Sequence, residues 1–419
     1  MSMKKTFDEN AIQSATLASG LRIFLFPKRG FSKYYAVFAT NFGAVDSDFT
    51  FEGARGVTPA GVAHFLEHKV FEQKDENALQ KYARTGASPN AFTSNVMTAY
   101  HFECADSFYE NLEILLRFVT DPYFTDENVQ KEQGIIGQEI GMVEDTPDWV
   151  AFCNMFDALY HEHPVRESII GTVESIGKID KELLYRCHRA FYSPNNMVLV
   201  VAGDAELDRI VEMAQRLTKK APETVERHYG NEPEEARLHE IRRKMAVSMP
   251  VMSLGFKDAQ AKGARGVRRQ MLGELATEYF LGTSSALYEA LYERGLINRN
   301  FEAGYEMFPE TAVLLAAGES ANPGAVRDMV LAEGARIAHE GVDAALFERV
   351  RRSYYGMRVR RADSFEALCI GQVQTYFAGA ENVLDFTAEY ESITAEDVRA
   401  FIAALVTERR AALSVVEPA

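Results

Sequence analysis

The sequence has no uncharged apolar run long enough to cross a bilayer, and no apolar segment follows the lysines near its start. A membrane-spanning helix needs about 20 mostly apolar residues, and a secretory signal needs an apolar stretch behind its positive charges. The sequence therefore predicts a soluble, cytoplasmic protein with no membrane partner.

Cysteine is scarce too, and the four residues are far apart and form no CxxC pair: Cys104, Cys153, Cys187 and Cys369. This spacing favours reduced thiols over disulfides or a thiolate metal site.

The sequence has fewer basic than acidic residues, so the formal net charge is -16 and the pI is near 5.2. Phosphate binding needs a basic face, so no nucleic-acid partner is expected.

The chain is long and rich in apolar residues. Its 419 residues are too many for one ordinary domain, and its 47% hydrophobic content is ample for packed cores, so two domains are expected. A segment rich in charge, proline and glycine, Thr218–Arg243, separates two apolar runs with strand character, Leu199–Asp204 and Met245–Phe256. This composition predicts an interdomain linker near residue 230.

The two halves of the chain repeat each other. Segments that begin at Glu174 and Glu391 each contain a Ser-Ile lead-in, an amphipathic helix and a strand. We therefore predict an α+β fold of two duplicated domains, each a mainly antiparallel sheet with helices packed on one face. The predicted bounds are 1–225 for the first domain, 226–244 for the linker and 245–419 for the second.

The stretch "GVAHFLEHKVFE" has the pattern of a helix that carries three titratable side chains. Thr58 is the expected N-cap and Pro59 the expected first helical residue, so this helix should run from about Pro59 to Phe71. His64 and His68 are four residues apart and therefore lie on the same side of the helix.

Glu67 lies beside this histidine pair, and the three groups together predict a catalytic zinc site. Two imidazoles one turn apart can bind one ion. Zinc lowers the pKa of bound water, and an adjacent carboxylate can accept the proton as that water attacks a carbonyl. A single histidine is more often a core or surface residue, but a His-x-x-Glu-His cluster inside an apolar helix favours the metal site.

A third ligand is expected from a second predicted helix, Thr125–Asp145, which offers Glu132, Glu139 and Glu144. Isoleucines flank Glu139, where a carboxylate would be costly without a cation. Glu132 lies in a polar run and Glu144 near the helix end, so Glu139 is the predicted ligand.

Three glycines recur on another side of the same predicted helix: Gly134, Gly137 and Gly141. Each should cost up to about 1 kcal/mol relative to alanine. We therefore expect another backbone to pack closely against them.

These motifs carry a family resemblance. "HFLEH", the glutamate in "KEQGIIGQEIGM" and the segments "DTPDW", "GTVESI" and "FYSPNNMVLVVAGD" resemble the inverzincin metallopeptidases, which include pitrilysin, insulin-degrading enzyme and the mitochondrial processing peptidase. The sequence is most similar to the short bacterial branch. The resemblance implies one Zn²⁺ per chain on His64, His68 and Glu139, with Glu67 as the base and Glu132 as a supporting catalytic residue.

The segment "NAFT" resembles the edge strand with which this family pairs an extended peptide substrate. Such pairing holds a peptide through main-chain hydrogen bonds, although a plain hairpin fits the pattern as well. The resemblance implies four substrate-binding residues: Asn90, Ala91, Phe92 and Thr93.

The second half departs from the family pattern. Family members place an arginine and a tyrosine that hold the peptide where this sequence has Tyr292 and Asn298. The family also encloses its peptide between two facing halves, and this chain has the length of one half. We therefore expect a heterodimer with a related chain that lacks the zinc motif, with a homodimer as the alternative.

The predicted function is zinc-dependent endopeptidase action on peptides or short unfolded segments, with catalysis in the first domain and a non-catalytic second domain. Two alternatives stay open: a non-catalytic or partner-dependent scaffold subunit, and a zinc hydrolase of a non-peptide bond. His161 and His163 in "YHEHP" are expected to be loop residues. Cys187 and His188 are adjacent on a predicted helix and point apart, so no thiol-protease pair is expected.

Overall fold

The computed structural model of the chain describes residues 12–218, 223–259 and 264–419. Residues 1–11 and 219–222 of the predicted first domain, and residues 260–263 of the predicted second domain, lie outside this description. No helix within the described ranges is both long and apolar enough to span a membrane.

A six-stranded sheet organises the first half of the chain, with strand order β1-β2-β8-β3-β7-β6. Its strands are β1 (Gln13–Thr16), β2 (Arg22–Pro27), β3 (Tyr34–Thr40), β6 (Ser88–Thr93), β7 (Thr98–Cys104) and β8 (Met197–Gly203). Neighbouring strands are antiparallel except for β2 and β8. A small second sheet consists of β5 (Ala54–Val57), β4 (Asp48–Phe51) and β9 (Glu226–Arg227).

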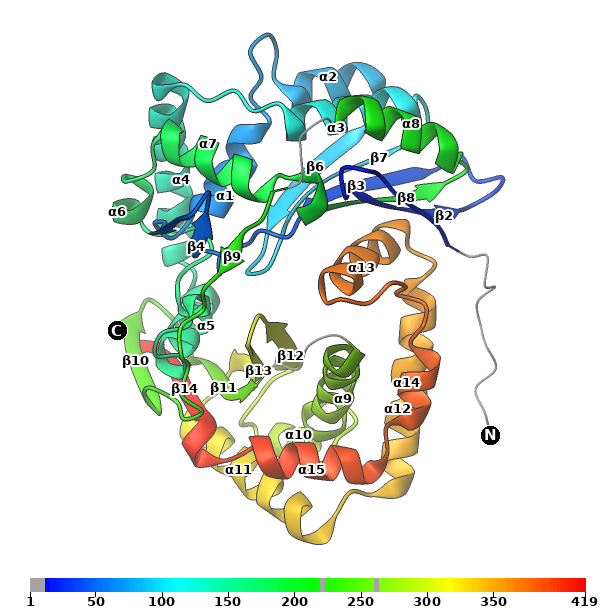
Figure 1. Cartoon of the computed structure of the whole chain (residues 1–419). Helices are drawn as coiled ribbons and strands as arrows, with labels where there is room; N and C mark the ends of the chain where they lie inside the picture. Colours follow the sequence, from blue (N-terminus) through cyan, green and yellow to red (C-terminus); the bar gives the residue numbers. More distant parts are fainter. Residues whose placement is uncertain (1–11, 219–222, 260–263) are drawn as a thin grey trace.

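Helices of the first half cover one face of its large sheet (Figure 1), and most of the helices share an apolar core with Ile23, Leu25 and Phe38 of that sheet. The helices are α1 (Val62–Val70), α2 (Ala78–Thr85), α3 (Phe108–Thr120), α4 (Asp126–Glu144), α5 (Pro147–Leu159), α6 (Val173–Ile176), α7 (Lys181–Phe191) and α8 (Leu207–Leu217). Two short 3₁₀ helices are η1 (Pro164–Arg166) and η2 (Pro194–Asn196).

The second half repeats this plan with a five-stranded sheet of order β10-β14-β11-β13-β12. Its strands are β10 (Glu240–Met245), β11 (Val251–Ala259), β12 (Glu302–Phe308), β13 (Thr311–Glu319) and β14 (Ala411–Pro418). Its helices are α9 (Ala264–Leu281), α10 (Ala286–Glu293), α11 (Pro323–Glu340), α12 (Ala344–Arg361), α13 (Phe365–Phe377), α14 (Thr387–Ser392) and α15 (Ala395–Leu405), with a 3₁₀ helix η3 (Glu408–Arg410).

The two sheets confirm the predicted duplication. In each, the last strand of the half pairs in parallel with one neighbour, β2–β8 in the first and β10–β14 in the second. The repeated sequence segments form equivalent units, α7–η2–β8 and α15–η3–β14. The α+β fold of two mainly antiparallel sheets is therefore as expected.

The halves also exchange one helix each. Helix α5 of the first half packs on β11 and β14 of the second sheet, and α13 of the second half packs on β3 and β8 of the first sheet (Figure 1). Gly255 on β11 permits this close packing, because a Cβ there would lie 2.6 Å from Leu159 Cδ1 and 2.7 Å from Met155 Sδ. Each sheet therefore has one face covered by the other half.

The predicted start of the first metal-site helix is wrong. Helix α1 begins at Val62, and its N-cap is Gly61 at φ 91°. Thr58 instead donates its hydroxyl to the Ser47 carbonyl oxygen at 3.2 Å. A side chain at Gly61 would also lie 2.6 Å from the Ile170 carbonyl oxygen, so only glycine fits this left-handed turn.

The segment predicted as a linker, residues 226–244, is paired at both ends. Strand β9 pairs with β4 of the first half, and β10 pairs with β14 of the second. Between them, the Glu232 carboxylate accepts backbone N–H groups of residues 161–163 and contacts buried Lys257 at 2.7 Å. The predicted strand run Met245–Phe256 is interrupted, because β10 ends at Met245 and β11 begins at Val251.

Candidate metal centre

Helices α1 and α4 bring two imidazoles and a carboxylate together. The His64 Nε2 atom lies 3.6 Å from Glu139 Oε1, and the His68 Nε2 atom lies 3.8 Å from Glu139 Oε2. One atom from each of the three residues lies within 4.8 Å of the others. Nitrogen and oxygen ligands held tetrahedrally at about 2.0–2.1 Å from zinc lie roughly 3.3 Å apart. The donor set therefore fits a zinc ion.

Glu132 lies behind this group and contacts His68 from the other side of the ring. Its Oε1 is 3.0 Å from His68 Nδ1, and its Oε2 is 3.4 Å from the ammonium of Lys69, which is fully buried. Burial would raise the pKa of Glu132, but the hydrogen bond with His68 and the charge of Lys69 lower it overall. With Nδ1 engaged, His68 turns Nε2 toward Glu139. Glu144 is exposed near the end of α4 and outside this cluster.

Glu67 is buried beside the two histidines, and the Thr93 hydroxyl donates to its Oε2 at 2.6 Å. Burial raises the pKa of Glu67, against a smaller lowering by the Thr93 hydrogen bond. Burial and the neighbouring His68 lower the pKa of His64 to about 4, so its imidazole is neutral at pH 7. A neutral imidazole next to a buried carboxylate suits metal binding and proton transfer.

Strand β6 has a free outer edge within the described residues, because β7 is the one strand that pairs with it there. Thr93 and Ala91 lie on the side of α1, whereas Phe92 packs on the opposite face of the sheet. The Asn90 carboxamide oxygen accepts the backbone N–H of Ala91 at 2.9 Å. Peptide binding to these four residues stays a prediction.

Tyr292 and Asn298 lie in the second half, at the end of α10 and in the loop after it. Tyr292 is 44% exposed and stacks on Tyr288 with ring centroids 6.3 Å apart. Asn298 donates its amide to Glu319 Oε2 at 2.6 Å. Neither side chain brings a positive charge to this position.

The rival sites do not form catalytic groups. Burial raises the pKa of the Cys187 thiol to about 12, and the His188 ring hydrogen-bonds the Val119 carbonyl oxygen at 2.9 Å. His163 is buried with both ring nitrogens engaged, by the Pro309 carbonyl oxygen and the Val165 backbone N–H.

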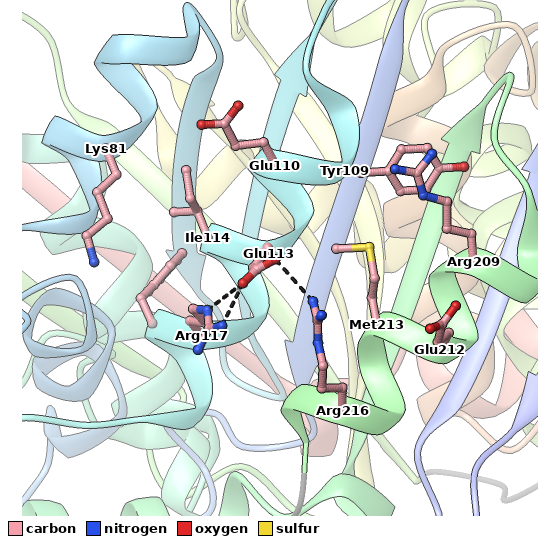
Figure 2. Close-up of a pocket in the computed structure, with 11 residues that line it drawn as sticks. Lys81, Tyr109, Glu110, Glu113, Ile114, Arg117, Arg209, Glu212, Met213 and Arg216 are labelled. Carbon is pink, nitrogen blue, oxygen red and sulfur yellow. Dashed lines mark hydrogen bonds and ion pairs between the residues drawn. The ribbon is translucent and has the colours of Figure 1, made fainter.

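A cavity of about 530 Å³ lies between α3 and α8 on the first half, away from the metal centre. Figure 2 shows that Arg117 and Arg216 both reach Glu113, which neutralises part of the basic wall. The Arg209 guanidinium lies 3.6 Å from the centre of the Tyr109 ring. None of the predicted site residues lines this cavity.

Sequence reasoning missed two supporting groups of the centre. Lys69 directly follows His68. A lysine inside an apolar helix indicates a buried carboxylate partner, so the sequence could have predicted its ion pair with Glu132. The contact of Thr93 with Glu67 had no local signal, because 26 residues separate them.

Two family models match this chain, and several known proteins are similar to it. Residues 53–173 match the family model described as insulinase (peptidase family M16), and residues 178–354 match the peptidase M16 inactive domain. The zinc protease YmfH of Bacillus subtilis is 36% identical over 410 residues, which cover 96% of this chain and 95% of YmfH. The zinc protease ML0855 of Mycobacterium leprae is 27% identical over 381 residues, which cover 84% of this chain and 82% of ML0855.

Solved structures show the same fold. An M16-like peptidase from Alicyclobacillus acidocaldarius superposes with a TM-score of 0.95 at 33% identity, and 100% of each chain is covered. The periplasmic protease PqqL of Escherichia coli has a TM-score of 0.75 at 16% identity, with 100% of this chain matching 48% of the PqqL chain. The fold of this chain therefore corresponds to about half of PqqL.

Proposed function

Because the chain belongs to the insulinase family of peptidases, family M16, we propose that it is a zinc-dependent endopeptidase that hydrolyses peptides or short unfolded segments. The observation that carries this proposal is the convergence of His64, His68 and Glu139 beside the buried carboxylate of Glu67. We also propose that residues 1–225 hold all of the catalytic groups and that residues 245–419 form a non-catalytic repeat.

His64, His68 and Glu139 would hold the zinc ion, and Glu132 would orient the His68 ring. When bound, zinc supplies Lewis-acid polarisation of the substrate carbonyl and of water. Glu67 accepts a proton as a water oxygen attacks the carbonyl carbon, and it donates a proton to the nitrogen that leaves when the C–N bond breaks. A peptide paired on β6 would lie beside this carboxylate.

Two observations weigh against the alternatives. A non-catalytic scaffold subunit has no need of a buried Glu67 next to a converged ligand set. The free edge of β6 favours an extended peptide over a small ester or amide, because an edge strand binds through successive main-chain hydrogen bonds.

The test is the Glu67→Gln variant of the full chain, assayed both alone and with the partner chain proposed below. We expect it to keep about one zinc per chain but to lose peptide turnover by at least ~100-fold, because the proton acceptor is removed and no ligand is changed. Metal analysis and a mixed-peptide cleavage assay measure the two effects. Glu174→Gln, in an exposed ion pair, is the control, and native turnover by Glu67→Gln would refute the mechanism.

We further propose that a related chain without the zinc motif completes the active enzyme as a heterodimer. Tyr292 and Asn298 supply no cation to hold the peptide, so the partner would contribute an arginine and a tyrosine. Positioned, charge-assisted contacts near the reacting carbonyl are worth orders of magnitude in rate. Assays of the chain alone and with such a partner test this, and full activity of the isolated chain that the partner leaves unchanged would contradict it.

A further inference from the structure

We propose that Thr93 is a positioning residue that holds the carboxylate of Glu67 in its reactive orientation. This inference rests on the proposed peptidase function and adds to it, because the resemblance gives Thr93 only a contact with substrate. Thr93 is the last residue of β6. The same strand would then fix both the base and the peptide.

The contact itself is short and directional. The Thr93 hydroxyl donates to Glu67 Oε2 at 2.6 Å, and among the described residues it is the one side chain that hydrogen-bonds this carboxylate. Glu67 is 8% exposed, so a carboxylate without this donor would be buried and unsatisfied. Oε2 is held, and Oε1 is left to exchange a proton.

Within the hairpin this hydroxyl makes only a long contact. Backbone pairing places Thr93 opposite Thr98, and their hydroxyl oxygens lie 3.5 Å apart, but the Thr98 hydroxyl donates to the Phe42 carbonyl oxygen at 2.9 Å. Ser94 closes the turn instead, since its backbone N–H donates to Met97 and its hydroxyl oxygen accepts the N–H groups of Val96 and Met97. The Thr93 hydroxyl is therefore directed to Glu67 without a structural requirement of the turn.

A neighbouring loop fixes the position of the turn. The backbone N–H groups of Ala44 and Val45 donate to the carbonyl oxygens of Ser94 and Asn95 at 3.1 and 3.0 Å. A Cβ at Gly43 would lie 2.4 Å from backbone atoms of Asn95, so the two segments are in close backbone contact. The end of β6 has little room to shift.

The loop is in turn anchored by Asp46, which is 2% exposed. Its carboxylate accepts the Gly43 backbone N–H at 2.9 Å, the Arg227 guanidinium at 2.8 Å and the Tyr229 hydroxyl at 2.9 Å. A carboxylate with three such donors is well fixed. Arg227 and Tyr229, in the segment between the halves, therefore help through Asp46 to fix the turn that holds Thr93 beside Glu67.

A held base is catalytically useful because proton transfer depends on a fixed distance and direction between donor and acceptor. A glutamate side chain has several rotatable bonds, and burial alone does not select one carboxylate orientation. The Thr93 hydroxyl selects one. Because β6 is also the proposed peptide-binding strand, the distance between the base and a paired peptide is set within one hairpin.

The test compares Thr93→Val, which removes the hydroxyl at similar size, with Thr93→Ser, which keeps it. Each variant is made in the full chain, loaded with zinc, checked for a thermal transition and assayed both alone and with the proposed partner chain. We expect Thr93→Val to lower kcat on a peptide substrate roughly 10- to 100-fold, with KM within about 3-fold and zinc content unchanged. Thr93→Ser should restore kcat to within about 3-fold of the wild type.

Crystal structures of the zinc-loaded variants provide a readout that does not depend on activity. In Thr93→Val the Glu67 carboxylate should rotate or occupy two orientations, and in Thr93→Ser it should stay in place. An unmoved carboxylate in Thr93→Val, or a raised KM with unchanged kcat, would overturn the proposal. If the wild type holds zinc but cleaves no peptide either alone or with the proposed partner chain, the proposed function fails, while the crystal structures still decide the role of Thr93.

Discussion

Lys69 follows His68 in the chain, but its ammonium contacts Glu72 at 2.7 Å and Glu132 at 3.4 Å inside the protein. The side chain is fully buried. The lysine therefore compensates the charge of the Glu132 carboxylate, and the proposed metal centre would depend on a cation that does not touch it.

Replacement of Lys69 by methionine should weaken both the fold and the centre. It leaves Glu132 buried without its cation, which typically costs about 3–5 kcal/mol, and a disturbed outer partner of a metal ligand typically lowers metal affinity about 10- to 100-fold. Urea unfolding of the zinc-free protein and competition with a chelator measure the two effects.

Lys178→Met is the matched control, because Lys178 forms an exposed pair with Glu174. Exposed pairs contribute about 0–1 kcal/mol, so its stability and zinc affinity should stay near those of the wild type. Equal behaviour of the two variants would show that Lys69 does not support the centre.

At the level of single residues, the sequence predicts what one helix can bring together. His64, Glu67 and His68 follow from spacing on α1, and Glu139 follows from the cost of a carboxylate among isoleucines. Partners from distant segments, such as Thr93 for Glu67, depend on how the hairpin packs on α1. No local pattern encodes that contact.

For helix α4, the sequence predicts the bounds of the element but not what packs against it. Its bounds agree with the predicted Thr125–Asp145, because Thr125 forms a capping box with Asn128. The expectation that its glycines contact another backbone is wrong. A Cβ at any of the three would have no neighbour within 4 Å in the described chain: Gly134, Gly137 and Gly141.

Alanine at Gly134 or Gly141 should therefore stabilise the protein. Both positions are exposed, and alanine in an exposed helix is favoured over glycine by up to about 1 kcal/mol. Urea unfolding of the single variants and of the double variant measures the gain.

Gly61→Ala serves as the opposite control for this comparison. Its φ of 91° and the Ile170 carbonyl oxygen 2.6 Å from the new Cβ make alanine unfavourable. We expect a loss of stability there. A loss at Gly134 as well would mean that the exposed face of α4 has contacts that the isolated chain does not show.

At the level of the whole molecule, the exchanged helices α5 and α13 join the halves more strongly than the connecting segment alone. Periodicity in the sequence identifies each as an apolar helix but does not say which sheet it covers. A helix of either half presents the same pattern whether it packs on its own sheet or on the other. The exchange was therefore beyond sequence reasoning.

This exchange predicts that a change in one half loosens the other. Leu368 on α13 is 4% exposed and belongs to the core that covers the first sheet. Leu368→Ala should cost about 2–5 kcal/mol and should speed amide hydrogen exchange in β3 and β8 of the first half.

Met155→Ala on α5 is the reciprocal variant, because Met155 is buried against the second sheet. It should speed exchange in β11 and β14. Faster exchange that stays within the half carrying each substitution would contradict a coupled fold.

The place of α13 in the chain has a consequence for biosynthesis. Strand β8 completes the first sheet at Gly203, but α13 ends at Phe377, which is 377 − 203 = 174 residues later. At about 5–20 residues per second, a ribosome needs roughly 10–35 s for that stretch. During this interval one face of the finished sheet exposes Phe24, Val37, Val198 and Val200. A nascent-chain chaperone that shields this face would limit aggregation until α13 emerges.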